Sequence, residues 1–180
     1  KNLLPENSWE VDYKNTLRVY QLLIEAEFLN MNFKGFDDLI QKAINRMEDV
    51  TDKADALAFS LLQKSIQGKY EEAIEVGSET LNMLGIKIPI STELETENTQ
   101  QLEKVTSHLQ EIGIEAITDL PSVQSQQMKK AIQFCILLDP LAYIVGNLPL
   151  SIYLSIKNVQ LSLKYGNTIS SCKGISSKKG

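Results

Sequence analysis

A single histidine is the side chain of this sequence best suited to metal or acid–base chemistry. His108 lies between Val105 and Leu109, two apolar positions of an otherwise polar helical segment. A metal site needs several ligands, and the sequence holds no second histidine and no cysteine near His108. Acid–base catalysis needs a positioned carboxylate, and Glu111 is weak support because half of the neighbouring positions are polar. We therefore interpret His108 as a surface or boundary residue.

Paired carboxylates are the other candidates for chemistry, and they stand near expected helix ends. The pairs are Asp37-Asp38, Glu48-Asp49 and Glu71-Glu72. Acidic side chains in a first turn complement the helix dipole, which gives Glu71-Glu72 a structural explanation. No nucleophile and base stand beside any pair. The sequence also lacks a Gly-rich phosphate loop and kinase catalytic motifs. It therefore predicts no catalytic site, no cofactor and no metal.

The elements that would position any site are helices. Apolar residues recur at helical spacing almost throughout, and no segment alternates with period two. Leu17, Ile24 and Phe28 share one face of a helix expected over residues 14–31. Similar stripes predict three more helices before Gly85, a residue typical of the position after a helix end.

These four helices predict two helix pairs related by a repeat. Asn32-Phe33 and Lys69-Tyr70 each open a second helix, and they stand 37 residues apart. Periods of ~34–47 residues in helix–turn–helix units are typical of tetratricopeptide and related solenoids. The segment Gly68–Glu75 is the better copy, with a glycine for the turn, an aromatic residue and the small Ala73.

The other copy is degenerate. Met31 stands at the glycine position and Phe36 at the alanine position, and Lys64 of the better copy replaces a usual aromatic residue. These departures favour an adapted solenoid over a regular one.

A linker and a helical cap are expected to follow. The linker ends in a capping-box pattern, Thr92-x-x-Glu95. A narrow-seamed helix comes next, then a buried helix over roughly Gln124–Leu138 that Pro140 breaks, then a long helix that Gly166-Asn167 ends. The predicted fold is thus all-α, an α-solenoid of about seven helices in a single domain, 1–167. Its parts are tetratricopeptide-like pairs (14–85), a linker (86–95) and a helical cap (96–167), before a polar tail (168–180).

Charge and hydropathy exclude two classes of protein. Residues 121–180 hold seven Lys and one Asp, a charge of +6. The net charge of the chain is −5, so residues 1–120 carry a charge of −11. An acidic first part argues against nucleic-acid binding, which needs clustered Lys and Arg. The most apolar stretch, 131–156, is interrupted by charged and proline residues and does not predict a membrane span. Residues 1–10 lack the apolar segment of a signal peptide, so we expect a cytoplasmic chain.

Cys135 and Cys172 make no disulfide framework, and we interpret Cys135 as a buried apolar residue.

Several segments together carry a resemblance to a known family. They are Leu4–Trp9 followed by Asp12-Tyr13, the aromatic-rich Glu27–Phe36, Ile114-Glu115 with Asp119–Pro121, and Val159–Asn167. In order and spacing they resemble the helical-repeat region of bacterial multi-domain signal-transduction kinases, over about Leu3 to Asn167. After Asn167 that family continues into an apolar helix, whereas this chain is polar and Ser/Lys-rich.

The resemblance implies a position after a serine/threonine kinase and an AAA/STAND-type ATPase, and before GAF and histidine-kinase domains. It therefore implies an excerpt of a longer protein whose catalysis lies elsewhere. The implied role is a non-catalytic domain that couples these modules or binds a protein partner. Two alternatives stay open: a stand-alone peptide-binding adaptor, and a ligand-sensing domain whose apolar segment Ile132–Leu154 encloses a hydrophobic small molecule.

Two surfaces are candidates for such contacts. Concave faces of helical repeats bind extended or helical partners. A stripe on the third helix would line such a face, or would simply be solvated: Lys53, Ser60, Lys64 and Gln67. The last helix is apolar on more than one face. We therefore predict an exposed apolar patch at the C-terminal end of the fragment, where the parent protein or a second copy would dock.

Overall fold

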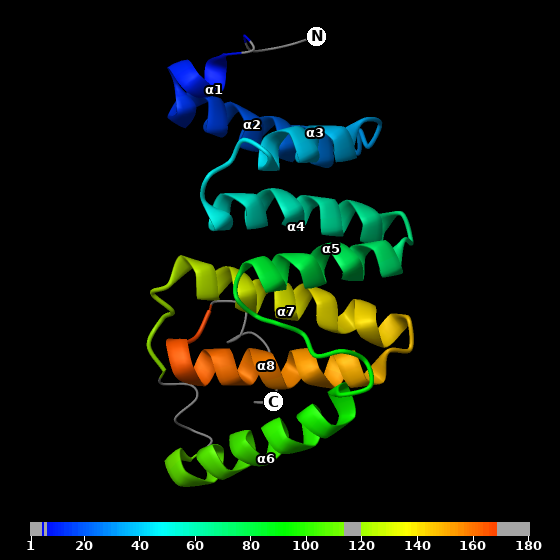
Figure 1. The fold of residues 1–180 in the computed structure, drawn as a ribbon, viewed down its shortest axis with the longest axis vertical. Helices are drawn as coiled ribbons and strands as arrows, with labels where there is room; N and C mark the ends of the chain where they lie inside the picture. Colours follow the sequence, from blue (N-terminus) through cyan, green and yellow to red (C-terminus); the bar gives the residue numbers. More distant parts are fainter. Residues whose placement is uncertain (1–4, 6, 114–119, 169–180) are drawn as a thin grey trace, which may run out of the picture. The chain divides into compact units, whose positions relative to one another are not determined.

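The structure is a computed structural model that describes residues 5, 7–113 and 120–168 (Figure 1). These residues form eight helices and no strand. The helices are α1 Ser8–Val11, α2 Tyr13–Leu29, α3 Phe36–Ile44, α4 Val50–Ile66, α5 Tyr70–Met83, α6 Leu94–Ile112, α7 Gln126–Ile144 and α8 Leu148–Tyr165. The predicted all-α class is confirmed, and the four-residue α1 raises the expected count of about seven to eight.

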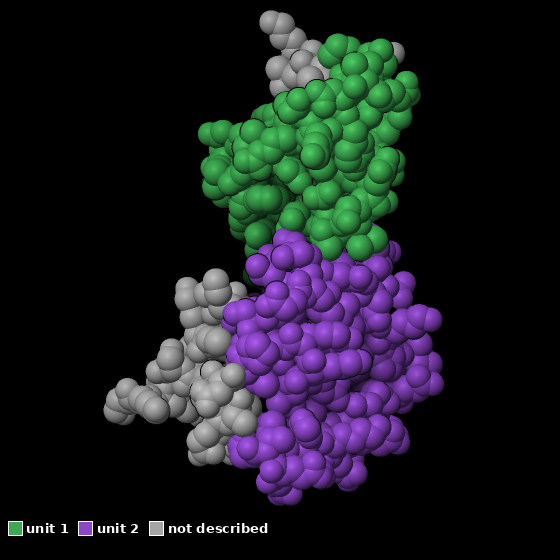
Figure 2. All heavy atoms as spheres, turned by 90° about the vertical axis from the view of Figure 1, so that its left-hand side faces the viewer, with its two compact units in different colours: residues 1–76 green, residues 77–180 purple. Residues whose placement is uncertain are grey.

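The chain divides into two compact units, residues 1–76 and 77–180, coloured separately in Figure 2. The division falls within α5. The sequence predicted a single domain, in which the linker 86–95 separates the helix pairs from the helical cap. The polar tail from residue 169 onwards, and the predicted motif Ile114-Glu115, lie outside the described residues.

Unit 1 is built around the contacts of α2, α3 and α4 with one another. Its buried cluster contains Ile24 of α2, Phe36 and Ile40 of α3, and Ala56 of α4. Aromatic rings surround this cluster, and the ring centroid of Phe28 lies 5.2 Å from that of Phe59 and 6.4 Å from that of Phe36. Ring contacts of Phe28 with Phe36 and Phe59 therefore join α2 to α3 and to α4.

The first helices of the two predicted pairs have matching ends. Both α2 and α4 have 17 residues, and they start 37 residues apart. Each start is capped by an aspartate: Asp12 accepts a hydrogen bond from the Asn15 backbone N–H, and Asp49 accepts one from the Thr51 N–H. Such caps satisfy backbone donors that a helix leaves without partners.

The turns after α2 and α4 also match. Met31 and Gly68 occupy equivalent positions, and their backbones are left-handed, with φ of 54° and 74°. The next N–H groups donate back across the turn, Asn32 to the Glu27 carbonyl and Lys69 to the Lys64 carbonyl, both at 2.9 Å. This hydrogen-bond pattern is the Schellman motif, which closes a helix end. The spacing of 37 residues thus holds for caps, helix ends and turns, while the tetratricopeptide relationship itself stays a prediction.

Unit 2 is built around α8, which packs on α7 and on α6. Ile132, Phe134 and Leu138 of α7 and Leu154 of α8 are fully buried. The Tyr153 hydroxyl of α8 donates to the Lys87 carbonyl at 2.9 Å, which fixes the segment after α5 to this core.

Two expected helix boundaries in unit 2 differ from the sequence prediction. Pro140 was expected to break the helix, yet α7 continues through it to Ile144. Proline inside a helix removes one backbone hydrogen bond, and burial of Leu141 and Ala142 beyond it offsets that loss. The capping box at Thr92 is absent, because α6 starts at Leu94 with Glu93 as its N-cap and no side-chain cap.

The end of α8 is closed by the segment before α7. Asn167 donates its N–H to the Pro121 carbonyl at 2.8 Å and accepts from the Val123 N–H at 3.0 Å. Gly166 has φ +106°, and a Cβ there would lie 2.2 Å from the Pro121 carbonyl oxygen, so the site requires glycine. The exposed large apolar residues of α8 are Leu148 and Ile152, both near its start. The docking patch at the C-terminal end of the fragment stays a prediction.

Candidate partner-binding face

The stripe predicted on α4 does not form one exposed face. Ser60 is only 4% exposed, so its hydroxyl cannot reach a partner. Lys53 is half-buried, and the Lys64 side chain is 12% exposed because acidic side chains of neighbouring helices surround its amine. Gln67 is exposed, and its side-chain oxygen accepts a hydrogen bond from the Gln63 amide at 3.1 Å.

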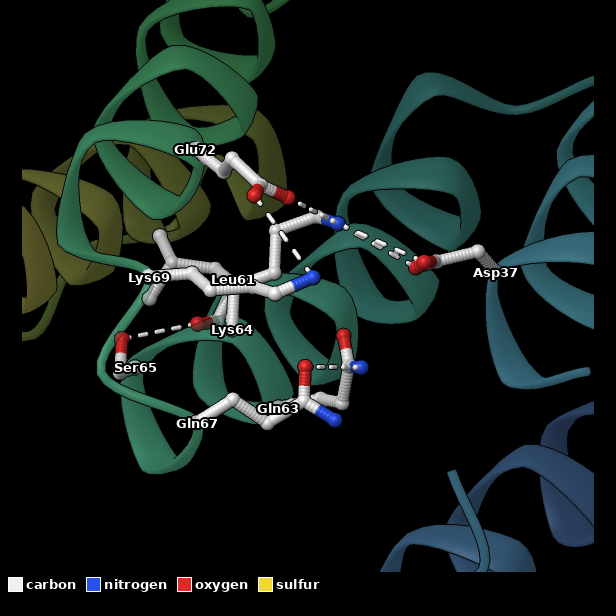
Figure 3. A network of polar contacts seen from close by, with 8 residues as sticks. All are labelled: Asp37, Leu61, Gln63, Lys64, Ser65, Gln67, Lys69 and Glu72. Atoms are coloured by element: carbon white, nitrogen blue, oxygen red, sulfur yellow. Dashed lines mark hydrogen bonds and ion pairs between the residues drawn. The ribbon is translucent and has the colours of Figure 1, made fainter. Parts of the chain in front are cut away.

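Lys64 is the centre of a network of polar contacts (Figure 3). Its Nζ lies 3.4 Å from the Asp37 carboxylate of α3 and 3.2 Å from the Glu72 carboxylate of α5. Lys69 approaches Glu72 from the turn, at 3.6 Å. Both carboxylates stand in the first turn of their helices, where acidic residues are favoured. Lys64 of α4 therefore connects three helices, α3, α4 and α5.

The electrostatics of this network act on Glu72. A hydrogen bond from Lys64 is the main cause that lowers the pKa of the Glu72 carboxyl. Desolvation opposes this shift, and the charges of Lys69 and Lys64 add to it. The carboxylate is half exposed, so water screens the pairs. The network joins α3, α4 and α5 and acts as a clamp between these helices.

A groove on unit 1 is the better candidate for partner binding. It has a volume of about 190 Å³ and lies between α2 and α4, the first helices of the two pairs. Its lining residues are Arg18, Gln21, Ile24, Glu25, Asp55, Ala56 and Phe59. In helical repeats, one set of helices lines the concave binding surface, and α2 and α4 are the equivalent helices here.

The groove combines an apolar floor with a charged rim. Ile24 and Ala56 are buried and Phe59 is half-buried, so the floor is apolar. Arg18 and Glu25 are exposed on the α2 side. On the same side, the Gln21 amide donates to the Asp52 carboxylate of α4 at 3.1 Å, which fixes the distance between the two helices.

The groove lies on a different side of α4 from the stripe that the sequence predicted. The groove uses Asp55, Ala56 and Phe59, whereas the predicted stripe ran through Lys53 and Ser60. A signal was present in the repeat: Arg18 and Asp55 are 37 residues apart and face each other's helices across the groove. The spacing relates no other pair of lining residues, so it could not have located the whole groove.

The residues first considered for chemistry occupy separate places. The His108 side chain is 51% exposed and lies 3.8 Å from the Glu111 carboxylate, as a surface pair. Cys135 is buried, and desolvation raises the pKa of its thiol to about 12, so it stays protonated. Among the described residues no group of three or more His, Cys, Asp or Glu could hold a metal ion. Cys172 lies outside them.

No protein-family model, no curated protein and no solved structure matches this chain. Within the part of the chain that the structure describes, no helix is both long and apolar enough to cross a membrane.

Proposed function

We propose that this chain is a non-catalytic interaction domain that binds an extended peptide segment of a protein partner in the α2–α4 groove. The observation that carries the proposal is the groove itself, an apolar floor with a charged rim between equivalent helices. The family resemblance of the sequence adds the context: the partner is a module of the same signalling kinase or a protein that regulates it.

The chemistry of the groove indicates the kind of peptide. Its lining holds one arginine and two carboxylates, Glu25 and Asp55, and Asp52 lies beside it on α4. Unit 1 belongs to the acidic part of the chain. Complementary charge guides such encounters. The groove therefore favours a peptide with an apolar side chain for Phe59 and flanking Lys or Arg.

A peptide library tests this function directly. Displayed random 12-residue peptides are selected on the full chain, and the enriched sequence is measured by fluorescence anisotropy. We expect enrichment of basic residues around one apolar residue. Glu25→Lys, an exposed change on the rim, should weaken binding at least tenfold, because it reverses one charge.

Glu75→Lys is the matched control, because it makes the same charge change at an exposed position of α5 in unit 1, outside the groove lining. It should leave binding unchanged. Equal weakening by both variants would show a general charge effect and contradict the groove. The kinase context has its own test: the reading frame should encode a serine/threonine kinase and an ATPase domain before this segment, and GAF and histidine-kinase domains after it.

A further inference from the structure

A second cavity, in unit 2, is lined by basic side chains. It has a volume of about 340 Å³ and lies between α6 and α8. Its described lining residues are Lys104, Val105 and His108 of α6 and Gln160, Leu163 and Lys164 of α8, with no carboxylate among them. None of these residues lines the α2–α4 groove.

Basic residues from both helices line this cavity. Helix α6 has four glutamates, but its two basic residues, Lys104 and His108, are one turn apart and both line the cavity. Helix α8 has no carboxylate, and its two lysines are Lys157 and Lys164. Lys164 lines the cavity, and Lys157 donates to the side-chain oxygen of Gln160 at 3.0 Å. Lys104, His108 and Lys164 thus line the same space, whereas the Lys157 Nζ lies outside the lining, 5.2 Å from the centroid of the Tyr153 ring.

Nearby carboxylates only partly balance this charge. Glu111 lies 3.8 Å from His108 but is 76% exposed, and such surface pairs contribute little. Desolvation lowers the pKa of Lys157; the negative charge of Glu97 opposes this shift, and the positive charge of Lys104 adds to it. The positive charge that lines the cavity therefore comes from Lys104, Lys164 and, when protonated, His108, and it would attract an anion.

The same cavity also has apolar walls. Val105 is 8% exposed, and Leu163 of the facing helix is half-buried. Ligand pockets are typically concave, largely apolar and fitted with a few convergent polar groups, with volumes from roughly 300 Å³ upward. An inorganic ion would leave the apolar walls unused, and a neutral apolar molecule would leave the cations unused.

We propose that the α6–α8 cavity binds a small organic anion with an apolar body, such as an alkyl carboxylate. The carboxylate lies between Lys104 and Lys164, within reach of His108, and the alkyl chain packs on Val105 and Leu163. This site adds a small-molecule input to a domain whose other surface binds a protein. It does not depend on the peptide proposal, because it lies in another unit.

Octanoate is the probe for this site, and 1-octanol is its neutral counterpart of equal chain length. Binding to the full chain is followed by the methyl resonances of Val105 and Leu163 in a heteronuclear NMR titration. We expect saturable shifts of both residues with octanoate, and at least tenfold weaker binding of 1-octanol. Equal affinity for the two molecules, or no saturable shift at these methyl groups, would overturn the proposal.

Charge variants give the second arm of the test. The double variant Lys104→Gln/Lys164→Gln changes two exposed helix positions, and its helix content should match the unchanged chain by circular dichroism. It should bind octanoate at least tenfold more weakly, and the single variant His108→Gln should show a smaller loss. Lys42→Gln/Lys129→Gln removes the same charge outside the lining and should bind as the unchanged chain does. Undiminished binding by the first double variant would refute the site.

Discussion

The helix pairs α2–α3 and α4–α5 have similar backbone features but different residues at equivalent positions. Their first helices have equal length and equivalent aspartate caps, and their turns make the same hydrogen bonds. Yet Met31 replaces Gly68 in the turn, and Phe36 replaces Ala73 at a fully buried position. The two pairs therefore share their helix caps and turn hydrogen bonds, while the size of the side chain at an equivalent buried position differs between them.

The largest expected effect tests the packing of Phe36. Phe36→Ala installs the residue that the better copy carries at the same position. Because Phe36 is 1% exposed within the unit 1 core, the change should lower the free energy of unfolding by ~3–5 kcal/mol. Urea unfolding followed by Trp9 fluorescence reports on this unit, since Trp9 is the only tryptophan. An unchanged or higher free energy of unfolding would contradict the close packing of Phe36 in this core.

The reverse exchange, at Ala73, should have a smaller effect. Ala73 is 0% exposed, so Ala73→Leu must displace its neighbours, at a cost of ~1–3 kcal/mol. Glu75→Leu is the control, because it adds a similar side chain at an exposed position of the same helix. A change at Ala73 within ~0.5 kcal/mol, the usual range for surface substitutions, would contradict close packing there.

Much of the fold could be predicted because its signals are local. Helical periodicity located most helices, and Gly68 and Gly85 marked two helix ends, both with positive φ. The repeat spacing also marked Met31 as a turn residue before the structure showed its left-handed backbone. These features depend on residues close in sequence, so a single sequence contains them.

The errors concern tertiary context. Pro140 lies within a helix because burial beyond it offsets the lost hydrogen bond, and sequence spacing cannot measure that burial. Ser60 appeared to share a solvated face with Lys64, yet neighbouring helices cover both side chains. The groove and the α6–α8 cavity each need two helices brought together. Each site is therefore visible only once the packing is known.

The turns themselves give a third pair of experiments with modest effects. For residues other than glycine, the left-handed conformation costs roughly 1–2 kcal/mol because the Cβ crowds the backbone. Gly68→Ala should therefore destabilise unit 1 by about 1 kcal/mol, whereas Met31→Gly should stabilise it by up to about 1 kcal/mol. Met31 is 60% exposed, so few packing contacts are lost. Urea unfolding measures both, and a loss of stability in Met31→Gly would show that its side chain contributes more than the strain costs.

The smallest effect concerns the acid sensitivity of the second pair alone. Position 27, equivalent to Lys64, holds a glutamate that accepts a hydrogen bond from Asn32, so the first pair lacks the ion pairs of the second. Lys64 lowers the pKa of the Glu72 carboxyl in the folded chain. Glu72 therefore contributes stability above the ordinary carboxyl pKa, roughly 4.3, and that contribution is lost as pH falls through the lowered folded pKa.

Glu72→Gln isolates this contribution, because it removes the titrating group and keeps the shape of the side chain. Between neutral pH and about pH 3, the urea midpoint of the unchanged chain should fall by more than that of Glu72→Gln. Glu75→Gln, on the same helix, should follow the unchanged chain. Because Glu72 is half exposed, the difference should also shrink when salt is raised to about 1 M, where charges are screened beyond roughly 3 Å. If the urea midpoints of Glu72→Gln and the unchanged chain depend on pH in the same way, the ion pair between Lys64 and Glu72 does not stabilise the second helix pair.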